Sequence, residues 1–168
     1  MITTIQDFVT NSKTYIEKLN AFAEKGNLAG IVVVDHLGYK CGSKESFEKM
    51  REMFESHSEY IFQSIISQRR ISYIKLKQPI VTGLGDLWFV ELQDQKPDGS
   101  QIEKFDHVEG YSVGISYGEM VEKISGFETI VESNKSHHPT HDVDLGDGFS
   151  FKCTYGPLLD KIKDQEMI

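Results

Sequence analysis

The sequence predicts an α+β fold in which two tandem βαβββ modules form a curved mixed-sheet cup, with an added N-terminal helix. Helix-like and strand-like segments follow one another in the same order in both halves of the chain. A polar stretch over 93–101, QDQKPDGSQ, separates the halves. The first strand of each half carries Asp-His, at Asp35-His36 and again at Asp106-His107. The repeat is imperfect, because one extra residue, Glu109, interrupts the match that follows the second pair.

The length of 168 residues fits one domain over 1–168. We expect it to comprise an N-terminal helical segment (1–26), a first βαβββ module (30–93) and a second module (104–163). In the first half, apolar residues at helical spacing predict a helix, and β-branched runs predict strands. The predicted elements are a helix over 4–25, strands over 30–36, 61–66, 71–77 and 87–92, and a helix of roughly 12 residues after Ser43.

We expect Pro79 to end the strand over 71–77. The second half repeats the pattern after the polar stretch. Its predicted elements are strands over 105–113, 127–132, 141–145 and 149–155, a helix over 117–124 and a last helix over 157–163.

Charge and composition exclude several classes of function. The net charge of −8 argues against nucleic-acid binding, which normally leaves a basic patch, and favours a small polar or cationic partner. No apolar run approaches the roughly 20 residues that span a bilayer, and the N-terminus lacks a secretory pattern. Cys41 and Cys153 lie in apolar segments, so we expect both to be buried in a protein of the reducing cytoplasm.

Four polar residues occupy otherwise apolar strands: His36, Glu91, His107 and Lys152. A buried polar group without a partner costs several kcal/mol, so each of these side chains needs one. If the two modules curl together, the four positions converge in the cup. Two histidines and one carboxylate suit Zn, Ni, Mn or Fe(II) and leave room for a substrate.

Other polar residues keep two interpretations each. Glu109 shares the His107 face by alternation, as a general base, a partner of the ligands or a solvated charge at the strand end. Lys75 lies on a polar outer face of its strand or, if that face lines the cup, meets an anionic substrate, as Arg70 would. We expect the His137, His138 and His141 stretch to be a polar loop without a structural metal.

Nearly all of the chain after the first helix resembles the YecM family, within the vicinal-oxygen-chelate (glyoxalase, bleomycin-resistance and dioxygenase) superfamily. The segments that carry the resemblance are 34–37 with 40–41, 71–79, 89–92, 106–109, 139–140 and 149–152. The resemblance implies that paired modules form a cup in which His and Glu side chains of the first and last strands bind a divalent metal. His36, Glu91 and His107 match three of these positions. Lys152 departs from the fourth, where glyoxalase-type enzymes use Glu, and a protonated lysine cannot bind a metal.

The resemblance therefore implies a metal-dependent enzyme acting on a small polar molecule, with lyase, isomerase or oxidoreductase chemistry left open. Its candidate catalytic residues are Glu109, Lys152 and Lys75, with Lys152 stabilising anionic charge or orienting Glu91. The alternative is a metal-free small-molecule binding module, in which Glu91 and Lys152 form an ion pair beside the two hydrogen-bonded histidines. Because both modules lie in one chain, a monomer can complete the cup.

Overall fold

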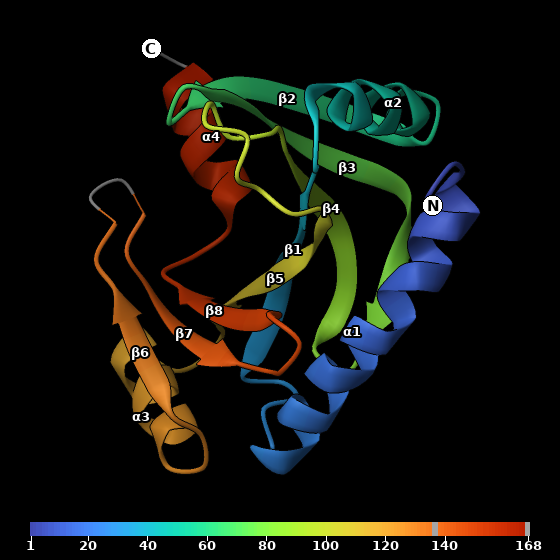
Figure 1. Ribbon diagram of the computed structural model, residues 1–168. Helices are drawn as coiled ribbons and strands as arrows, with labels where there is room; N and C mark the ends of the chain where they lie inside the picture. The colour runs from blue at the N-terminus through green and yellow to red at the C-terminus, as the bar shows by residue number, and fades with distance from the viewer. Residues whose placement is uncertain (136–137, 167–168) are drawn as a thin grey trace.

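The computed structural model describes residues 1–135 and 138–166, and within this part of the chain eight strands form one mixed sheet flanked by four helices (Figure 1). The helices are α1 (Ile5–Lys25), α2 (Lys44–Glu55), α3 (Tyr117–Ser125) and α4 (Leu158–Glu166). The strands are β1 (Val32–Lys40), β2 (Ser58–Ile66), β3 (Arg69–Thr82), β4 (Gly85–Gln93), β5 (Lys104–Ser112), β6 (Ile130–Ser133), β7 (Thr140–Asp144) and β8 (Ser150–Thr154). After α1 the order is βαβββ twice, which confirms the predicted fold class.

The sheet order is β2-β3-β4-β1-β5-β8-β7-β6. Within each module the first and last strands are parallel neighbours, β1 with β4 and β5 with β8. The modules join through the antiparallel pair β1–β5 at the centre of the sheet. This topology places the strands that carry His36, His107 and Glu91 side by side.

One face of the sheet is closed by helices. The α1 residues Phe8, Leu19 and Phe22 are buried, and α2 adds Phe47 and Phe54. Apolar burial of this kind stabilises by roughly 25 cal/mol per Å², so it holds α1 and α2 against the sheet. On the other side of the sheet, polar side chains of β1, β4 and β5 line a cavity, to which α4 contributes Leu158, Lys161 and Ile162.

The prediction that Pro79 ends its strand is wrong, because β3 continues to Thr82. Proline lacks the N–H that a ladder needs. The register between β3 and β4 shifts between Lys75 and Ile80, and the pairing of β3 with β2 ends at Leu76. Pro79 therefore occupies an irregular stretch, where a missing donor costs no regular ladder bond.

The polar stretch between the modules is held at both ends by buried polar side chains, whereas residues 96–100 are exposed. Gln93, Asp94, Gln95 and Gln101 are all buried. The Gln95 side-chain amide donates to the carbonyl oxygen of Gly42 at 2.6 Å and to that of Gln101 at 2.9 Å. These amides donate to buried backbone carbonyl groups. A polar composition does not reveal this structural role, because it is equally typical of an exposed linker.

Two further expectations concern burial and membranes. Cys41 and Cys153 are fully buried, as predicted, and burial raises the pKa of each thiol to about 12. Among the described helices, none combines the length and apolar character needed to cross a membrane.

Candidate metal centre

The first Asp-His pair lies at a β-bulge in β1. Val34 pairs with Gly110 of β5, and His36 pairs with Glu109, so Asp35 is an extra residue opposite Glu109. Neighbouring side chains of a regular strand point to opposite faces, whereas a bulge re-aims one of them. Asp35 therefore lies beside His36 on the concave face, with its carboxylate 2.7 Å from Nδ1 of the imidazole.

The second Asp-His pair repeats this arrangement in β5. Gly38 pairs with His107, and Tyr39 pairs with Phe105, which leaves Asp106 as the extra residue. The Asp106 carboxylate lies 2.9 Å from Nδ1 of His107. In the neutral imidazole, each carboxylate fixes the Nδ1–H tautomer, and the Nε2 lone pair can then bind a metal in place of a proton.

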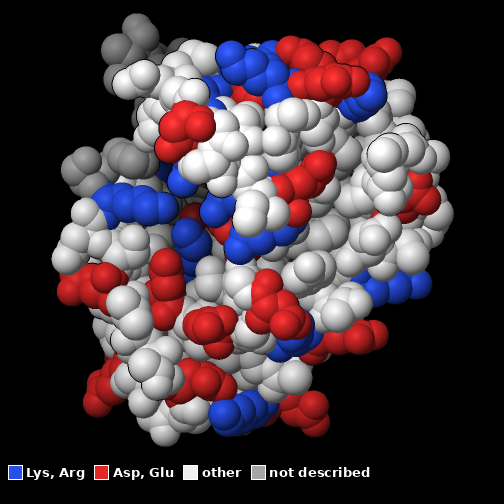
Figure 2. Space-filling model, viewed as in Figure 1, with Lys and Arg blue, Asp and Glu red and all other residues white. Residues whose placement is uncertain are grey.

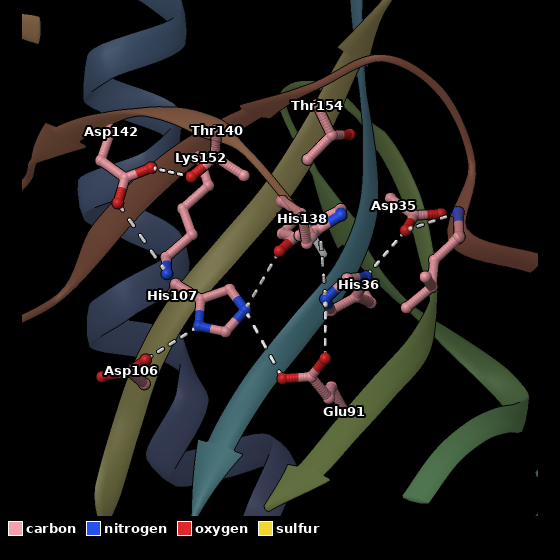
Figure 3. Close-up of polar contacts among 12 residues, drawn as sticks. Asp35, His36, Glu91, Asp106, His107, His138, Thr140, Asp142, Lys152 and Thr154 are labelled. Atoms are coloured by element: carbon pink, nitrogen blue, oxygen red, sulfur yellow. Dashed lines mark hydrogen bonds and ion pairs between the residues drawn. The ribbon is translucent and has the colours of Figure 1, made fainter. Parts of the chain in front are cut away.

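The two free nitrogens face two carboxylates (Figure 3). Nε2 of His36 lies 3.7 Å from a Glu91 oxygen and 3.8 Å from a Glu109 oxygen. Nε2 of His107 lies 3.9 Å from Glu91 and 3.8 Å from Glu109. The structure thus brings His36, Glu91 and His107 together as one possible ligand group. Glu109 forms a second group with Asp35 and His36, and its two oxygens face Nε2 of His36 and Nε2 of His107.

These side chains are withdrawn from solvent. His36 is fully buried and Glu109 is 4% exposed. Burial opposes a positive charge on His36, but Glu109 and the hydrogen-bonded Asp35 outweigh burial and raise its pKa to about 9. Burial likewise opposes the Glu109 carboxylate, but the imidazoles of His36 and His138 hold its pKa well below its usual range. Glu109 is therefore a buried anion, and its interpretation as a solvated charge is wrong.

The donor set fits a divalent metal ion. Among the described residues, Nε2 of His36 and Nε2 of His107 are buried without a hydrogen-bond partner, which is costly for a ring nitrogen unless a ligand satisfies it. Ligands bound at 2.0–2.1 Å around a tetrahedral ion lie about 3.4 Å apart. The observed separations of 3.7 to 3.9 Å therefore need a contraction of a few tenths of an ångström.

Gly38 makes room for this arrangement. A Cβ atom at position 38 would lie 2.4 Å from Cε1 of the His107 ring. Gly38 follows His36 by two residues, as Glu109 follows His107 by two, and the paired registers make these positions equivalent. One of the two equivalent positions supplies a carboxylate, and the other must lack a side chain because the His107 ring fills its space.

Neither Lys152 nor Lys75 forms an ion pair with Glu91 or Glu109 among the described residues. Lys152 neighbours Glu109 in the β5–β8 register, and its Nζ is 3.9 Å from Asp142. The proposed ion pair of Lys152 with Glu91 is not among the contacts of the described residues. Lys75 pairs with Glu59 at 2.8 Å, outside the cavity that opens on the histidines.

Arg70, the other residue expected to bind an anionic substrate, instead forms ion pairs with Glu48 and Asp94.

The histidines of the 137–141 stretch do not share a site within the described residues. His138 Nε2 contacts Glu109 at 2.9 Å, whereas His141 Nδ1 contacts the Tyr117 hydroxyl at 2.6 Å. His137 lies outside the described residues. The contact of His138 with Glu109 spans 29 residues of sequence, and no local pattern signals it.

A cavity of about 750 Å³ opens on this cluster. Glu91, His107, Glu109, His138 and Lys152 contribute to its lining. Its size is typical of sites that bind small molecules.

The model of the YecM protein family matches residues 4–145. A structural-genomics structure described as Protein EC4020 superposes with a TM-score of 0.75 and 18% identity, over 98% of each chain, and shares the fold. No curated protein matches the sequence.

Two further solved structures are more distant. Hypothetical protein BH1468 from Bacillus halodurans C-125 has a TM-score of 0.46 and 10% identity, over 74% of this chain and 96% of that one. The fosfomycin resistance protein FosX from Mesorhizobium loti has a TM-score of 0.29 and 12% identity, over 77% of this chain and 95% of that one.

Proposed function

The chain belongs to the YecM family, and we propose that it is a metal-dependent enzyme of the vicinal-oxygen-chelate type that acts on a small polar substrate. One observation carries this proposal: the two buried Nε2 atoms of His36 and His107 face a shared space without a hydrogen-bond partner among the described residues. Glu91 and Glu109 supply oxygen atoms to the same space.

Each residue has a defined role in the proposed site. His36, Glu91, His107 and Glu109 hold the ion, and Asp35 and Asp106 orient the two imidazoles through Nδ1. When bound, a divalent ion polarises substrate oxygen atoms or lowers the pKa of a bound water.

Two groups keep Asp35 in place for this role. The Tyr73 hydroxyl donates to Asp35 at 3.3 Å, and the backbone N–H of Leu158 donates to it at 3.2 Å. These bonds hold Asp35 as an acceptor, so that His36 keeps its proton on Nδ1. The fourth ligand position, which Lys152 cannot fill, falls to Glu109 of β5.

Metal analysis of protein purified without an affinity tag tests the proposal. We expect about one equivalent of Zn, Ni, Mn or Fe, or restoration to one equivalent when one of these ions is added. Glu109→Gln should lose bound metal, because an amide is a weaker ligand than a carboxylate. Glu132→Gln, which changes an exposed carboxylate of β6, is the matched control and should keep it.

Substoichiometric metal that none of the four ions restores would contradict the proposal. The same result would favour the second candidate, a metal-free binding module. The contact of His138 with Glu109 at 2.9 Å favours that candidate, since it balances a buried carboxylate without an ion. In that case Glu109→Gln should change stability and leave the trace metal content unaltered.

A further inference from the structure

The cavity beside the proposed metal centre collects positive charge, although the whole chain has a net charge of −8. Within the described residues, the cationic side chains that line it are Lys40, Arg69, Lys96, Lys135, Lys152 and Lys161. The carboxylates of the lining are Glu91, Asp106 and Glu109. All three lie against His36 or His107, and with these two residues they form what we call the histidine cluster. Figure 2 shows Lys and Arg side chains gathered around a hollow in this face of the molecule.

Several of these cations lack a close counter-charge. Lys152 Nζ lies 3.9 Å from Asp142, near the limit for an ion pair. Lys161 Nζ lies 3.5 Å from His138 Nδ1, and Lys135 makes no ion pair with any residue that the structure describes. Repulsion from the Lys152 ammonium, together with burial, lowers the pKa of Lys135. The cavity therefore holds positive charges that an anionic ligand would neutralise.

We propose that the substrate of this cavity is a small organic molecule with more than one negative charge, a phosphate ester or a dicarboxylate, whose anionic group is bound by Lys135, Lys152 and Lys161. The inference rests on the proposed function, because it takes the histidine cluster as the reacting end of the same cavity. Lys152 is the register neighbour of Glu109, so an anion on Lys152 lies next to the proposed ligands.

The rest of the lining suits a compact carbon skeleton. Ile71, Leu158 and Ile162 contribute apolar surface to the lining. The volume of about 750 Å³ falls in the range of small-molecule sites. The overall charge of the chain favoured a polar or cationic partner, but the field inside a concave site is set mainly by the groups that line it.

Calorimetric titration of metal-loaded protein at constant ionic strength tests the inference, with glycerol 3-phosphate, malonate and neutral glycerol as probes. We expect at least one of the two anions to bind and glycerol not to bind. Lys152→Met and Lys161→Met remove a charge while keeping a long side chain, and each should weaken anion binding about tenfold or more. Lys163→Met, on the same helix as Lys161 but outside the cavity lining, is the matched control and should leave binding unchanged.

The two anionic probes distinguish the sources of charge, since glycerol 3-phosphate alone would indicate a phosphate ester and malonate alone a dicarboxylate. Failure of both anions to bind, binding of glycerol as tight as that of the anions, or equal anion affinity in Lys152→Met, Lys161→Met and Lys163→Met, would overturn the inference. Metal content measured on the same samples separates the two proposals. Full metal with no lysine-dependent anion binding overturns this inference alone, whereas lysine-dependent binding without metal overturns the proposed metal chemistry alone.

Discussion

Replacing Gly38 with alanine should disable the proposed metal centre without replacing any proposed ligand. The added Cβ would lie 2.4 Å from Cε1 and 2.6 Å from Nδ1 of His107. Ordinary contact requires about 3.4 Å, so the ring or the strand must move by about 1 Å. His107 is 2% exposed and is held by Asp106 at 2.9 Å, so the ring has little space into which to move.

The expected magnitude follows from this displacement. Metal–ligand distances tolerate about 0.2 Å, so a shift of about 1 Å should remove His107 as an effective ligand. We expect Gly38→Ala to weaken metal binding by about 100-fold, or about 2.7 kcal/mol. Overpacking should also destabilise the metal-free protein by about 1–3 kcal/mol.

Competition with a chelator measures the metal affinity, and thermal unfolding of stripped protein measures the packing cost. Gly118→Ala is the matched control, because a Cβ at position 118 of α3 meets no atom within 4 Å, and it should behave like the parent protein. Folded Gly38→Ala protein that binds metal within about threefold of the parent would refute the reasoning, because a 100-fold loss is expected.

Three further predictions concern the two aspartates beside the histidines, the two buried cysteines and the effect of metal on stability. Asp35→Asn and Asp106→Asn should each reduce metal affinity about 10–100-fold in chelator competition, since each removes the carboxylate that orients an imidazole, and unchanged affinity in both would contradict that role. Cys41 and Cys153, with pKa values raised by burial to about 12, should resist a thiol reagent at pH 8 in native protein and react after denaturation, so rapid native labelling would disprove their burial. Metal at 100 times its dissociation constant should raise the free energy of unfolding by about 2.7 kcal/mol, and an unfolding temperature unaffected by a chelator would argue against a bound ion.

Local pattern predicted the fold because each element carries its own signal. Helical spacing in α1 and β-branched residues in β1 are properties of short segments, and their order alone specifies two βαβββ modules. The repeat then brought His36, Glu91 and His107 to adjacent strands. What local pattern could not supply was the register between β1 and β5, which joins residues about 70 positions apart.

Glu109 illustrates the consequence of that missing register. Alternation placed it on the His107 face but could not distinguish the end of a strand from the centre of a cluster. The pairing of His36 with Glu109 puts it at the centre. Pro79 shows the converse, since a residue that normally ends strands is tolerated where the register with β4 already shifts.

The Asp-His pairs contained a signal for these bulges. On a regular strand, an aspartate next to an inward-facing histidine points to the opposite face, which here is the apolar layer under α1. A buried carboxylate there would have no partner and would cost several kcal/mol. Two such pairs in two apolar strands are therefore compatible with a folded chain if each strand bulges and turns both side chains inward. The same bulges set the register that brings Glu109 to the cluster, so a lysine at position 152 does not leave the proposed site short of a carboxylate.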